Sequence, residues 1–278
     1  MRLGGPIFEE FTDPAGWVAA LRRVGYSAAG CPVRADAGED VINDYAAAAK
    51  AADIVIAEVG AWSNPLSDDE KTRRDALESC KRQLALAEQI GALCCVNIAG
   101  GRGDQWDGPH EENFSDETFE MTVATVREII DAVKPTRTFY TLEPMPWIFP
   151  ESPDDYLALI RAIDRPGFAV HLDPVNMITS PRRFFANAAF LRECFEKLGP
   201  HIKSVHGKDV VMTGEFNSHI GQVQPGLGKL DYGVFVTEME RLDGELPLMT
   251  EHLETAEEYA QAAGYIRSVA AGAGVKIK

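Results

Sequence analysis

The 278-residue sequence is short of cysteine, of basic residues and of long apolar runs. Its five cysteines are odd in number and follow no framework spacing, which argues against a disulfide-stabilised extracellular fold and favours a reducing cytoplasm. Nowhere do about 18 apolar residues follow one another, and the N-terminus lacks the apolar core of an export signal. We therefore expect neither a membrane span nor secretion.

The scarcity of basic residues gives the chain a strongly acidic charge balance. Lysine and arginine number 27 against 43 acidic residues, for a formal net charge of −16. Such a chain repels phosphate backbones and anionic lipid surfaces, so neither nucleic acid nor a membrane is expected as a partner. The 45% of hydrophobic residues is ordinary for a globular protein with a large core.

Short apolar runs alternate eight times with segments of helical periodicity. The expected strands lie near 2–5, 25–30, 54–60, 92–98, 138–143, 168–173, 202–206 and 246–251. The expected helices span 14–24, 39–51, 68–90, 116–133, 153–163, 181–198, 232–242 and 256–272. Eightfold alternation over a length near 250 residues predicts an α/β protein with a single (β/α)8 TIM barrel spanning residues 1–278.

Capping signals support several of these helix starts. The segments 67–70 and 255–258 have the Ser/Thr-x-x-Glu pattern of a capping box. In Ser152-Pro153 and Ser180-Pro181, a capping residue precedes a proline at the first helical position.

Three of the expected connections are unusually long, and each follows a strand. They span 61–67, 99–115 and 207–230. Because the loops after the strands build the active-site face of a barrel, we expect the substrate there. Trp62, Trp106 and Trp147 lie in such loops, where they can stack on a sugar ring or bury a contact between subunits.

Four polar residues follow or end four consecutive expected strands. They are Glu143, Asp173, His206 and Glu251. The carboxyl ends of barrel strands converge on the axis, so these side chains can meet around one ion despite their separation in sequence. Three carboxylates and one imidazole suit Mn²⁺, Mg²⁺, Co²⁺ or Zn²⁺. The sequence therefore predicts a divalent-metal site, although each of these residues alone is as well explained by a hydrogen bond or a helix cap.

The local motifs around these residues match a known family. They are Leu142-Glu-Pro144, His171-Leu-Asp-Pro-Val-Asn176, Val205-His-Gly-Lys-Asp209, Pro225-Gly-Leu-Gly-Lys-Leu-Asp-Tyr232 and Thr250-Glu251. In kind and in order, they resemble the sugar phosphate isomerase/epimerase family with the xylose-isomerase-like barrel. The resemblance spans nearly the whole chain. It implies a carbohydrate substrate, a divalent metal that is commonly Mn²⁺, and a homodimer or tetramer.

By this resemblance, Glu143, Asp173, His206 and Glu251 would be metal ligands, and the two glutamates would also move protons. Removing a proton beside a carbonyl requires stabilisation of the resulting enediolate, which a chelated metal provides as a Lewis acid. Two carboxylates on opposite faces of the carbon can then exchange its proton and epimerise it. Return of the proton to the adjacent carbon would instead interconvert an aldose and a ketose.

Further residues near the strand ends are candidate substrate contacts. His171 lies two residues before Asp173, on the same face but one layer deeper, where it can support the site or form a buried hydrogen bond. Glu58 ends the third strand, where it can bind a sugar hydroxyl or hydrogen-bond within the loop layer. Asn176 stands where several relatives have a histidine that faces the substrate, which puts identity of substrate with those relatives in doubt.

Two basic side chains complete the candidate list. Lys208 can stabilise negative charge on a substrate oxygen, or it can pair with the adjacent Asp209. The segment Gly100-Gly-Arg102-Gly103 offers backbone N–H groups and the Arg102 guanidinium, a combination suited to phosphate or carboxylate. Trp106 follows in the same loop as a candidate sugar contact.

Three other functions compete with the isomerase or epimerase. A lyase or dehydratase acting on an oxidised sugar, an inosose or a 3-oxo-glycoside, including C-glycoside cleavage, would share the enolate chemistry, with His219 as a candidate acid. An endonuclease IV type of phosphodiesterase would need more histidines and a DNA-binding surface. A binding protein without turnover would not require both Glu143 and Glu251.

Overall fold

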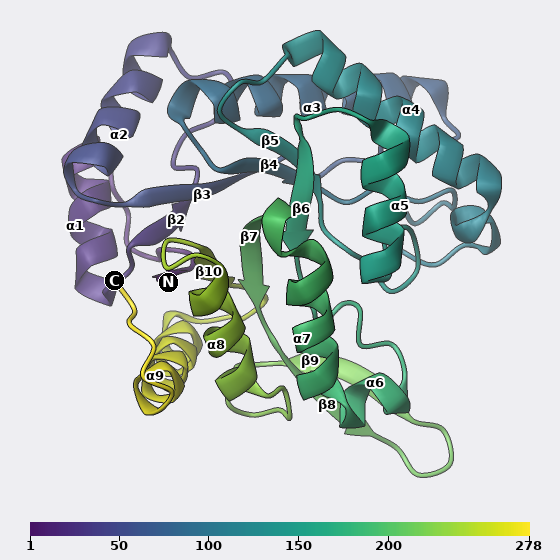
Figure 1. Ribbon diagram of the computed structural model, residues 1–278. Coiled ribbons are helices and arrows are strands. Elements are labelled where there is room, and N and C mark those ends of the chain that lie inside the picture. The colour runs from purple at the N-terminus through teal and green to yellow at the C-terminus, as the bar shows by residue number, and fades with distance from the viewer.

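The computed structural model describes residues 1–278 and confirms the predicted TIM barrel. Eight parallel strands close on themselves, each paired with its two neighbours (Figure 1). They are β1 (Arg2–Gly4), β2 (Ala28–Gly30), β3 (Val55–Gly60), β4 (Cys94–Asn97), β5 (Phe139–Leu142), β6 (Phe168–Leu172), β7 (Ile202–Gly207) and β10 (Pro247–Thr250). Pairing of β10 with β1 closes the barrel.

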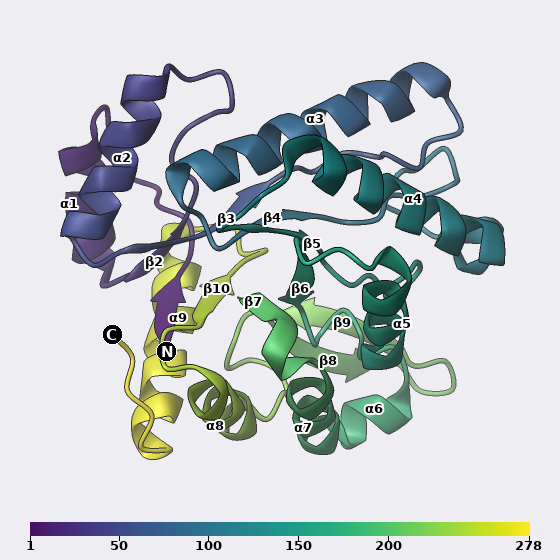
Figure 2. The same ribbon diagram turned by 45° about the horizontal axis from the view of Figure 1, so that its top comes forward.

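Helices surround the strands as an outer ring, which both views show (Figures 1 and 2). They are α1 (Pro14–Val24), α2 (Glu39–Ala51), α3 (Glu70–Ile90), α4 (Asp116–Val133), α5 (Pro153–Ile163), α6 (Pro181–Phe185), α7 (Asn187–Leu198), α8 (Tyr232–Leu242) and α9 (Ala256–Gly272). Two short 3-10 turns, η1 (Glu111–Phe114) and η2 (Gly199–His201), precede α4 and β7. No helix is both long enough and apolar enough to cross a membrane.

Helix termini follow the capping signals with two corrections. Ser152, Ser180 and Thr255 accept hydrogen bonds from the first turns of their helices, and Thr255 forms the predicted capping box with Glu258. The cap of α3 is Asp69 and not Ser67, so this helix begins two residues later than expected. The predicted helix 181–198 is divided at Ala186 into α6 and α7.

The connection 207–230, expected to be an irregular loop, contains a β-hairpin. Its strands β8 (Asp209–Thr213) and β9 (His219–Val223) pair antiparallel outside the barrel, beside α6 (Figure 2). Their inner face is only partly apolar, and the tip residue Phe216 is fully exposed. Such short strands with mixed polar residues give a weak periodicity signal, which explains why the sequence did not reveal them.

The apolar core lies between the barrel and its helices, and it contains thiols as well as hydrocarbon. Cys80, Cys94, Cys95 and Cys194 are buried, Cys31 is half-buried, and none forms a disulfide. The two chain ends lie side by side in both views, and the Lys278 N–H donates to the Met1 carbonyl at 3.1 Å (Figures 1 and 2). The core and the closed sheet thus hold the strand ends as a rigid frame.

Candidate metal centre

Four neighbouring strands deliver the predicted ligands to one place. Glu143 follows β5, Asp173 follows β6, His206 lies in β7 and Glu251 follows β10. These strands are consecutive in the sheet, so their carboxyl ends are adjacent. One donor atom from each residue lies within 4.8 Å of the donor atoms of the other three. The structure therefore brings together all four residues that the sequence selected.

His206 occupies the middle of the cluster. Its Nδ1 atom lies 3.0 Å from Glu143 Oε1, 2.9 Å from Glu251 Oε1 and 3.8 Å from Asp173 Oδ2. The side chains of His206, Glu143 and Asp173 are at most 3% exposed, whereas that of Glu251 is 20% exposed. Glu251 is thus the member of the group that solvent or a substrate can reach.

Two buried carboxylate oxygens in this cluster are contacted by side-chain nitrogens of lysine and histidine. They are Asp173 Oδ2 and Glu251 Oε1. The other oxygen of Asp173 accepts the N–H groups of Val175 and Asn176 at 3.0 and 3.2 Å, which fixes the orientation of the carboxylate. Both oxygens converge on the Lys208 ammonium, at 2.7 and 2.6 Å, so this pocket is shaped to hold a cation. The oxygen-rich donor set fits a hard or borderline divalent ion.

Lys208 extends into the same cluster. Its ammonium nitrogen lies 2.6 Å from Glu251 Oε1, 2.7 Å from Asp173 Oδ2 and 3.5 Å from Glu143 Oε1. These are close ion pairs, and Lys208 is therefore the cation that pairs with the buried oxygens of Glu251 and Asp173. The alternative partner Asp209 is excluded, because its carboxylate accepts backbone N–H groups of the loop after β9.

Asn176 links the lysine to the carboxylates. Its side-chain amide donates to Glu143 Oε1 at 3.1 Å, and its carbonyl oxygen accepts from Lys208 Nζ at 3.3 Å. Placed between a catalytic candidate and the ammonium group, Asn176 orients both.

Burial and mutual charge shift the pKa values of this cluster in opposite directions. Burial raises the pKa of Asp173 above its ordinary value, although Lys208 opposes the shift. Burial also acts to raise the pKa of Glu143, but the neighbouring His206 and Lys208 outweigh it and hold that pKa well below its usual range. Burial acts to lower the pKa of Lys208, and the surrounding carboxylates raise it above its ordinary value. The cluster thus balances three acidic groups against two basic ones in a space largely closed to water.

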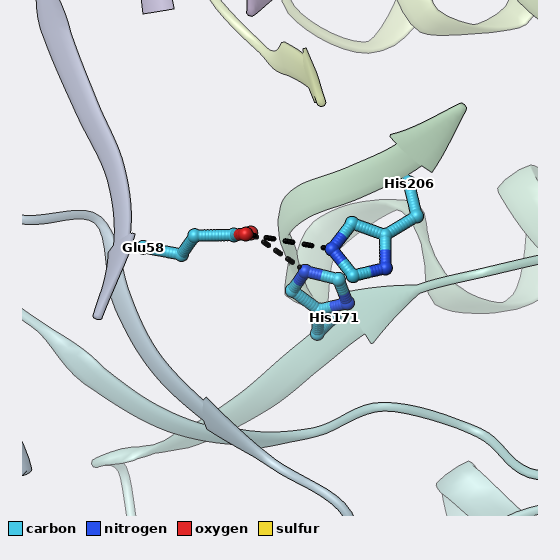
Figure 3. A group of neighbouring side chains, drawn as sticks. All are labelled: Glu58, His171 and His206. Atoms are coloured by element: carbon cyan, nitrogen blue, oxygen red, sulfur yellow. Dashed lines mark hydrogen bonds and ion pairs between the residues drawn. The ribbon is translucent and has the colours of Figure 1, made fainter. Parts of the chain in front are cut away.

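Glu58 and His171 lie next to His206, the imidazole of this cluster (Figure 3). Glu58 extends from β3, and its Oε2 atom lies 2.9 Å from Nε2 of His171, while its Oε1 atom lies 3.4 Å from Nε2 of His206. Of the two roles expected for Glu58, the structure shows hydrogen bonding, to two imidazoles, and the sugar contact stays a prediction. His171 is fully buried and contacts both Glu58 and the His206 ring.

Ser204 is a further neighbour of Glu58 that the sequence reasoning missed. Its hydroxyl donates to Glu58 Oε2 at 3.1 Å. A signal was present, because Ser204 lies two residues before His206 on β7 and side chains two apart on a strand share a face. The same spacing relates His171 to Asp173 on β6.

The structure does not bring the loop candidates Arg102 and Trp106 to the carboxylates. Both line a separate cavity next to α3, in which none of the four predicted ligands takes part. The Arg102 guanidinium is 10% exposed and pairs with Asp68 at 3.0 Å and Glu112 at 3.8 Å. Its charge therefore helps to hold the loop, and the anion or sugar contact expected there stays a prediction.

Other candidates in the loops are also placed away from the cluster. His219 is exposed at the start of β9, opposite Thr213 in the hairpin. Trp62 is 48% exposed and lines a cavity of about 870 Å³ that also reaches Glu58. This cavity lies between the loop after β2 and helix α3, and its size is sufficient for a small-molecule ligand.

Three solved structures illustrate the likeness of this fold to known ones. A xylose isomerase-like TIM barrel protein from Mycobacterium smegmatis, in complex with magnesium, has a TM-score of 0.66 and 17% identity, covering 94% of this chain and 90% of its own. The 3-keto-D-glucoside 4-epimerase from E. coli has a TM-score of 0.69 and 16% identity, covering 96% and 99%. The probable 3-DHS dehydratase AsbF from Bacillus anthracis has a TM-score of 0.70 and 15% identity, covering 96% and 97%.

At these identities, the likeness concerns the fold and not the reaction. Among curated proteins, no sequence matches this chain significantly. The family model described as the xylose isomerase-like TIM barrel, however, matches residues 18–269, which is most of the sequence. The chain therefore belongs to the xylose isomerase-like TIM barrel family.

Proposed function

We propose that the protein is a divalent-metal-dependent isomerase or epimerase of a sugar or a sugar-like carbonyl compound. One observation carries the proposal: four ligand atoms from four consecutive barrel strands converge within 4.8 Å of one another. A binding protein without turnover has no need for two glutamates in this position. A DNA phosphodiesterase fits poorly with the net charge of −16.

Glu143, Asp173, His206 and Glu251 would hold the metal ion. When bound, the ion would supply Lewis-acid polarisation of the substrate carbonyl. We propose Mn²⁺, and the donor set also suits Mg²⁺, Co²⁺ or Zn²⁺. The M. smegmatis protein of the same family was solved with magnesium, which supports a divalent ion without fixing its identity.

Glu143 and Glu251 are the proposed proton-transfer residues. They project from β5 and β10, which are separated in the sheet by β6 and β7, so they approach the site from two sides. One carboxylate takes the proton from the carbon beside the carbonyl, and the C–H electrons pass into an enediolate. The other carboxylate returns a proton to the opposite face of the same carbon, which inverts it. Return to the neighbouring carbon would isomerise the substrate.

Lys208 and Asn176 are the proposed contacts for the substrate oxygens. The Lys208 ammonium lies within 2.7 Å of two of the carboxylates, so a substrate near those carboxylates also comes within its reach. Its positive charge would stabilise a developing oxyanion in a site from which water is largely excluded. The substrate is proposed to be a carbohydrate because a similar structure is a keto-glucoside epimerase.

Elimination is the second candidate reaction. One similar structure is named as a probable dehydratase, and loss of a leaving group begins with the same proton abstraction. His219, which might have supplied an acid, is exposed on the hairpin and gives elimination no support. A lyase acting on an oxidised sugar would therefore need Lys208 or a carboxylate as its acid.

The decisive experiment combines metal analysis with proton exchange. Purified protein is assayed for bound divalent metal and then incubated in deuterated water with a panel of sugars and oxidised sugars. We expect one metal per chain and deuterium incorporation next to a carbonyl. Glu251→Gln should lose exchange, while Glu254→Gln, the same change at an exposed position three residues later, should retain it.

The outcomes separate the candidates. Deuterium incorporation without loss of water or of an aglycone supports the isomerase or epimerase, whereas an unsaturated product assigns a lyase. A protein that binds no divalent metal under metal-replete conditions would refute the proposal.

A further inference from the structure

We infer that Glu58 is a positioning residue that sets the ligand atom of His206, by holding the ring with Nε2–H toward β3 and Nδ1 toward the three carboxylates. This inference rests on the proposed function, because it concerns how the chain prepares a metal ligand. It assigns to Glu58 a role that neither the sequence motifs nor the fold requires.

The inference begins from the place of Glu58 in the barrel. β3 and β7 lie opposite one another in the closed sheet, with three strands between them in either direction. The Glu58 side chain therefore crosses the barrel interior to reach His206 and Ser204 on β7 and His171 on β6 (Figure 3). Apolar side chains usually fill the interior of a barrel, but here the charged side chain of Glu58 occupies part of it.

The contacts of Glu58 are all with hydrogen donors. Oε2 accepts from Nε2 of His171 at 2.9 Å and from the Ser204 hydroxyl at 3.1 Å, and Oε1 lies 3.4 Å from Nε2 of His206. A carboxylate has no hydrogen to donate, so each ring nitrogen that faces it must carry one. Nε2 of His171 therefore carries a hydrogen. His206 has carboxylates at both nitrogens, because Glu143 and Glu251 lie 3.0 and 2.9 Å from its Nδ1, so a divalent ion that replaces the hydrogen on Nδ1 leaves Nε2–H directed toward Glu58.

The environment of His171 supports this assignment. Its Nδ1 atom is buried and has no hydrogen-bond partner. A proton on that nitrogen would leave a buried N–H unpaired and would turn a bare lone pair toward the Glu58 carboxylate. The Nε2–H form avoids both costs. His171 is thus a donor that fixes one end of the Glu58 carboxylate.

His171 also restrains the His206 ring by direct packing. The two imidazoles meet edge to face, with centroids 4.1 Å apart and planes inclined by 75°. Rotation of the His206 ring would break this contact as well as the one with Glu58. With Nε2 occupied by its proton, Nδ1 is the only nitrogen that can offer a lone pair to a cation, and it is the one that faces Glu143 and Glu251.

A second cation bound by Glu58, His171 and His206 is the competing explanation, because their donor atoms also lie within 4.8 Å of one another. His206 would then have to ligate two ions, one through each nitrogen, which requires an imidazole stripped of both N–H protons. The positioning role needs no such loss. Ligating histidines generally donate their second N–H to a carboxylate or a carbonyl, and this partner orients the ring.

The test is the affinity for Mn²⁺, measured from the paramagnetic resonance of the free ion, with no substrate present. Glu58→Gln is nearly isosteric, but its amide cannot accept from two imidazoles and a hydroxyl at once. We expect it to weaken Mn²⁺ binding by about 10- to 100-fold, as is usual for loss of a ligand-orienting carboxylate. Ser204→Ala is the matched control: it removes one hydrogen bond to Glu58 and none to His206, so its affinity should stay within about threefold of wild type.

The tautomer is read independently from protein labelled with ¹⁵N-histidine and loaded with Zn²⁺, which is diamagnetic. His206 of the wild type should show a protonated Nε2 and an unprotonated Nδ1. The opposite tautomer would overturn the inference, and so would wild-type Mn²⁺ affinity in Glu58→Gln. Two Mn²⁺ ions per wild-type chain, with one lost in Glu58→Gln, would overturn it in favour of a second cation site.

These outcomes are distinct from failure of the proposed function. Wild-type protein that binds no Mn²⁺ would refute the metal-dependent reaction. The metal-free ¹⁵N spectra would then decide the role of Glu58. A His206 Nε2–H resonance that changes in Glu58→Gln but not in Ser204→Ala would support it, and identical resonances in all three proteins would overturn it.

Discussion

Asp209 and Gly228 are in contact across the whole hairpin connection: the Gly228 N–H donates to Asp209 Oδ2 at 3.0 Å. The same carboxylate accepts the N–H groups of Val210, Gly226 and Leu230 at 2.8 to 2.9 Å. Through these hydrogen bonds, Asp209 attaches the loop after β9 to the segment that directly follows β7. The carboxylate approaches Gly228 so closely that any Cβ there would overlap it.

Gly228→Ala is expected to loosen this loop, because the added methyl would collide with the Asp209 carboxylate and the Val210 carbonyl. We predict a loss of about 1–3 kcal/mol in the free energy of unfolding and faster proteolysis between residues 208 and 231. Urea denaturation and limited proteolysis measure the two effects. Gly221→Ala is the control, since nothing lies within 4 Å of its Cβ position, and it should remain within about 0.5 kcal/mol of wild type. Equal stability of the two variants would contradict the loop attachment assigned to Asp209.

The periodicity of the sequence predicts the barrel because it is a local signal repeated eight times. Apolar runs such as 168–173 and capped helices such as 153–163 are specified by neighbouring residues, and both appear at or within a residue of their expected bounds. Barrel topology then places the carboxyl ends of all strands at one face, which is why Glu143 and Glu251 could be selected together. The metal role that the sequence assigns them stays a prediction.

Contacts between distant residues are not encoded in that local signal. Glu58 was expected to bind a sugar hydroxyl or to hydrogen-bond within the loop layer, and its observed partners lie more than a hundred residues away on the opposite side of the barrel. The Gly100–Gly103 segment likewise suggested an anion site, yet Asn64 and Asn113 accept two of its N–H groups and acidic side chains pair with Arg102. In both cases, the side chain was identified from sequence and its partner was not.

Glu88 near the end of α3 should make stability depend on pH in the acidic range. Partial burial acts to raise its pKa, but the Thr136 hydroxyl and the N–H groups of residues 136–138 outweigh burial and lower the pKa from 4.5 to about 2. Because the folded pKa is the lower one, the stabilisation is complete above about pH 5 and is lost as the pH falls toward 2.

Glu88→Gln should therefore cost on the order of 1–2 kcal/mol at pH 7, after allowance for solvent screening of this partly exposed group, and less at pH 3. Urea denaturation of both proteins at the two pH values gives the difference. Glu196→Gln alters an exposed carboxylate that makes no hydrogen bond or ion pair and should show no such pH-dependent gap. A gap for Glu88→Gln that widens on acidification would contradict the direction of the pKa shift.

Lys208→Met tests the electrostatic balance of the candidate metal centre. The ammonium lies 2.6 and 2.7 Å from buried oxygens of Glu251 and Asp173, so the lysine and a divalent ion compete for the same two oxygens. Removing one partner of a buried ion pair typically costs about 3–5 kcal/mol, and the chelator-treated variant should unfold at a lower temperature than wild type. Mn²⁺ should then raise the unfolding temperature of Lys208→Met by more than it raises that of wild type, because the ion no longer displaces an ammonium group.

Differential scanning calorimetry of both proteins, with chelator and with excess Mn²⁺, provides all four unfolding temperatures. Lys71→Met, at an exposed position on α3, controls for the loss of a surface charge. If Mn²⁺ stabilised Lys208→Met less than wild type, the lysine would be supporting the ion, and the two cations would have to occupy separate positions.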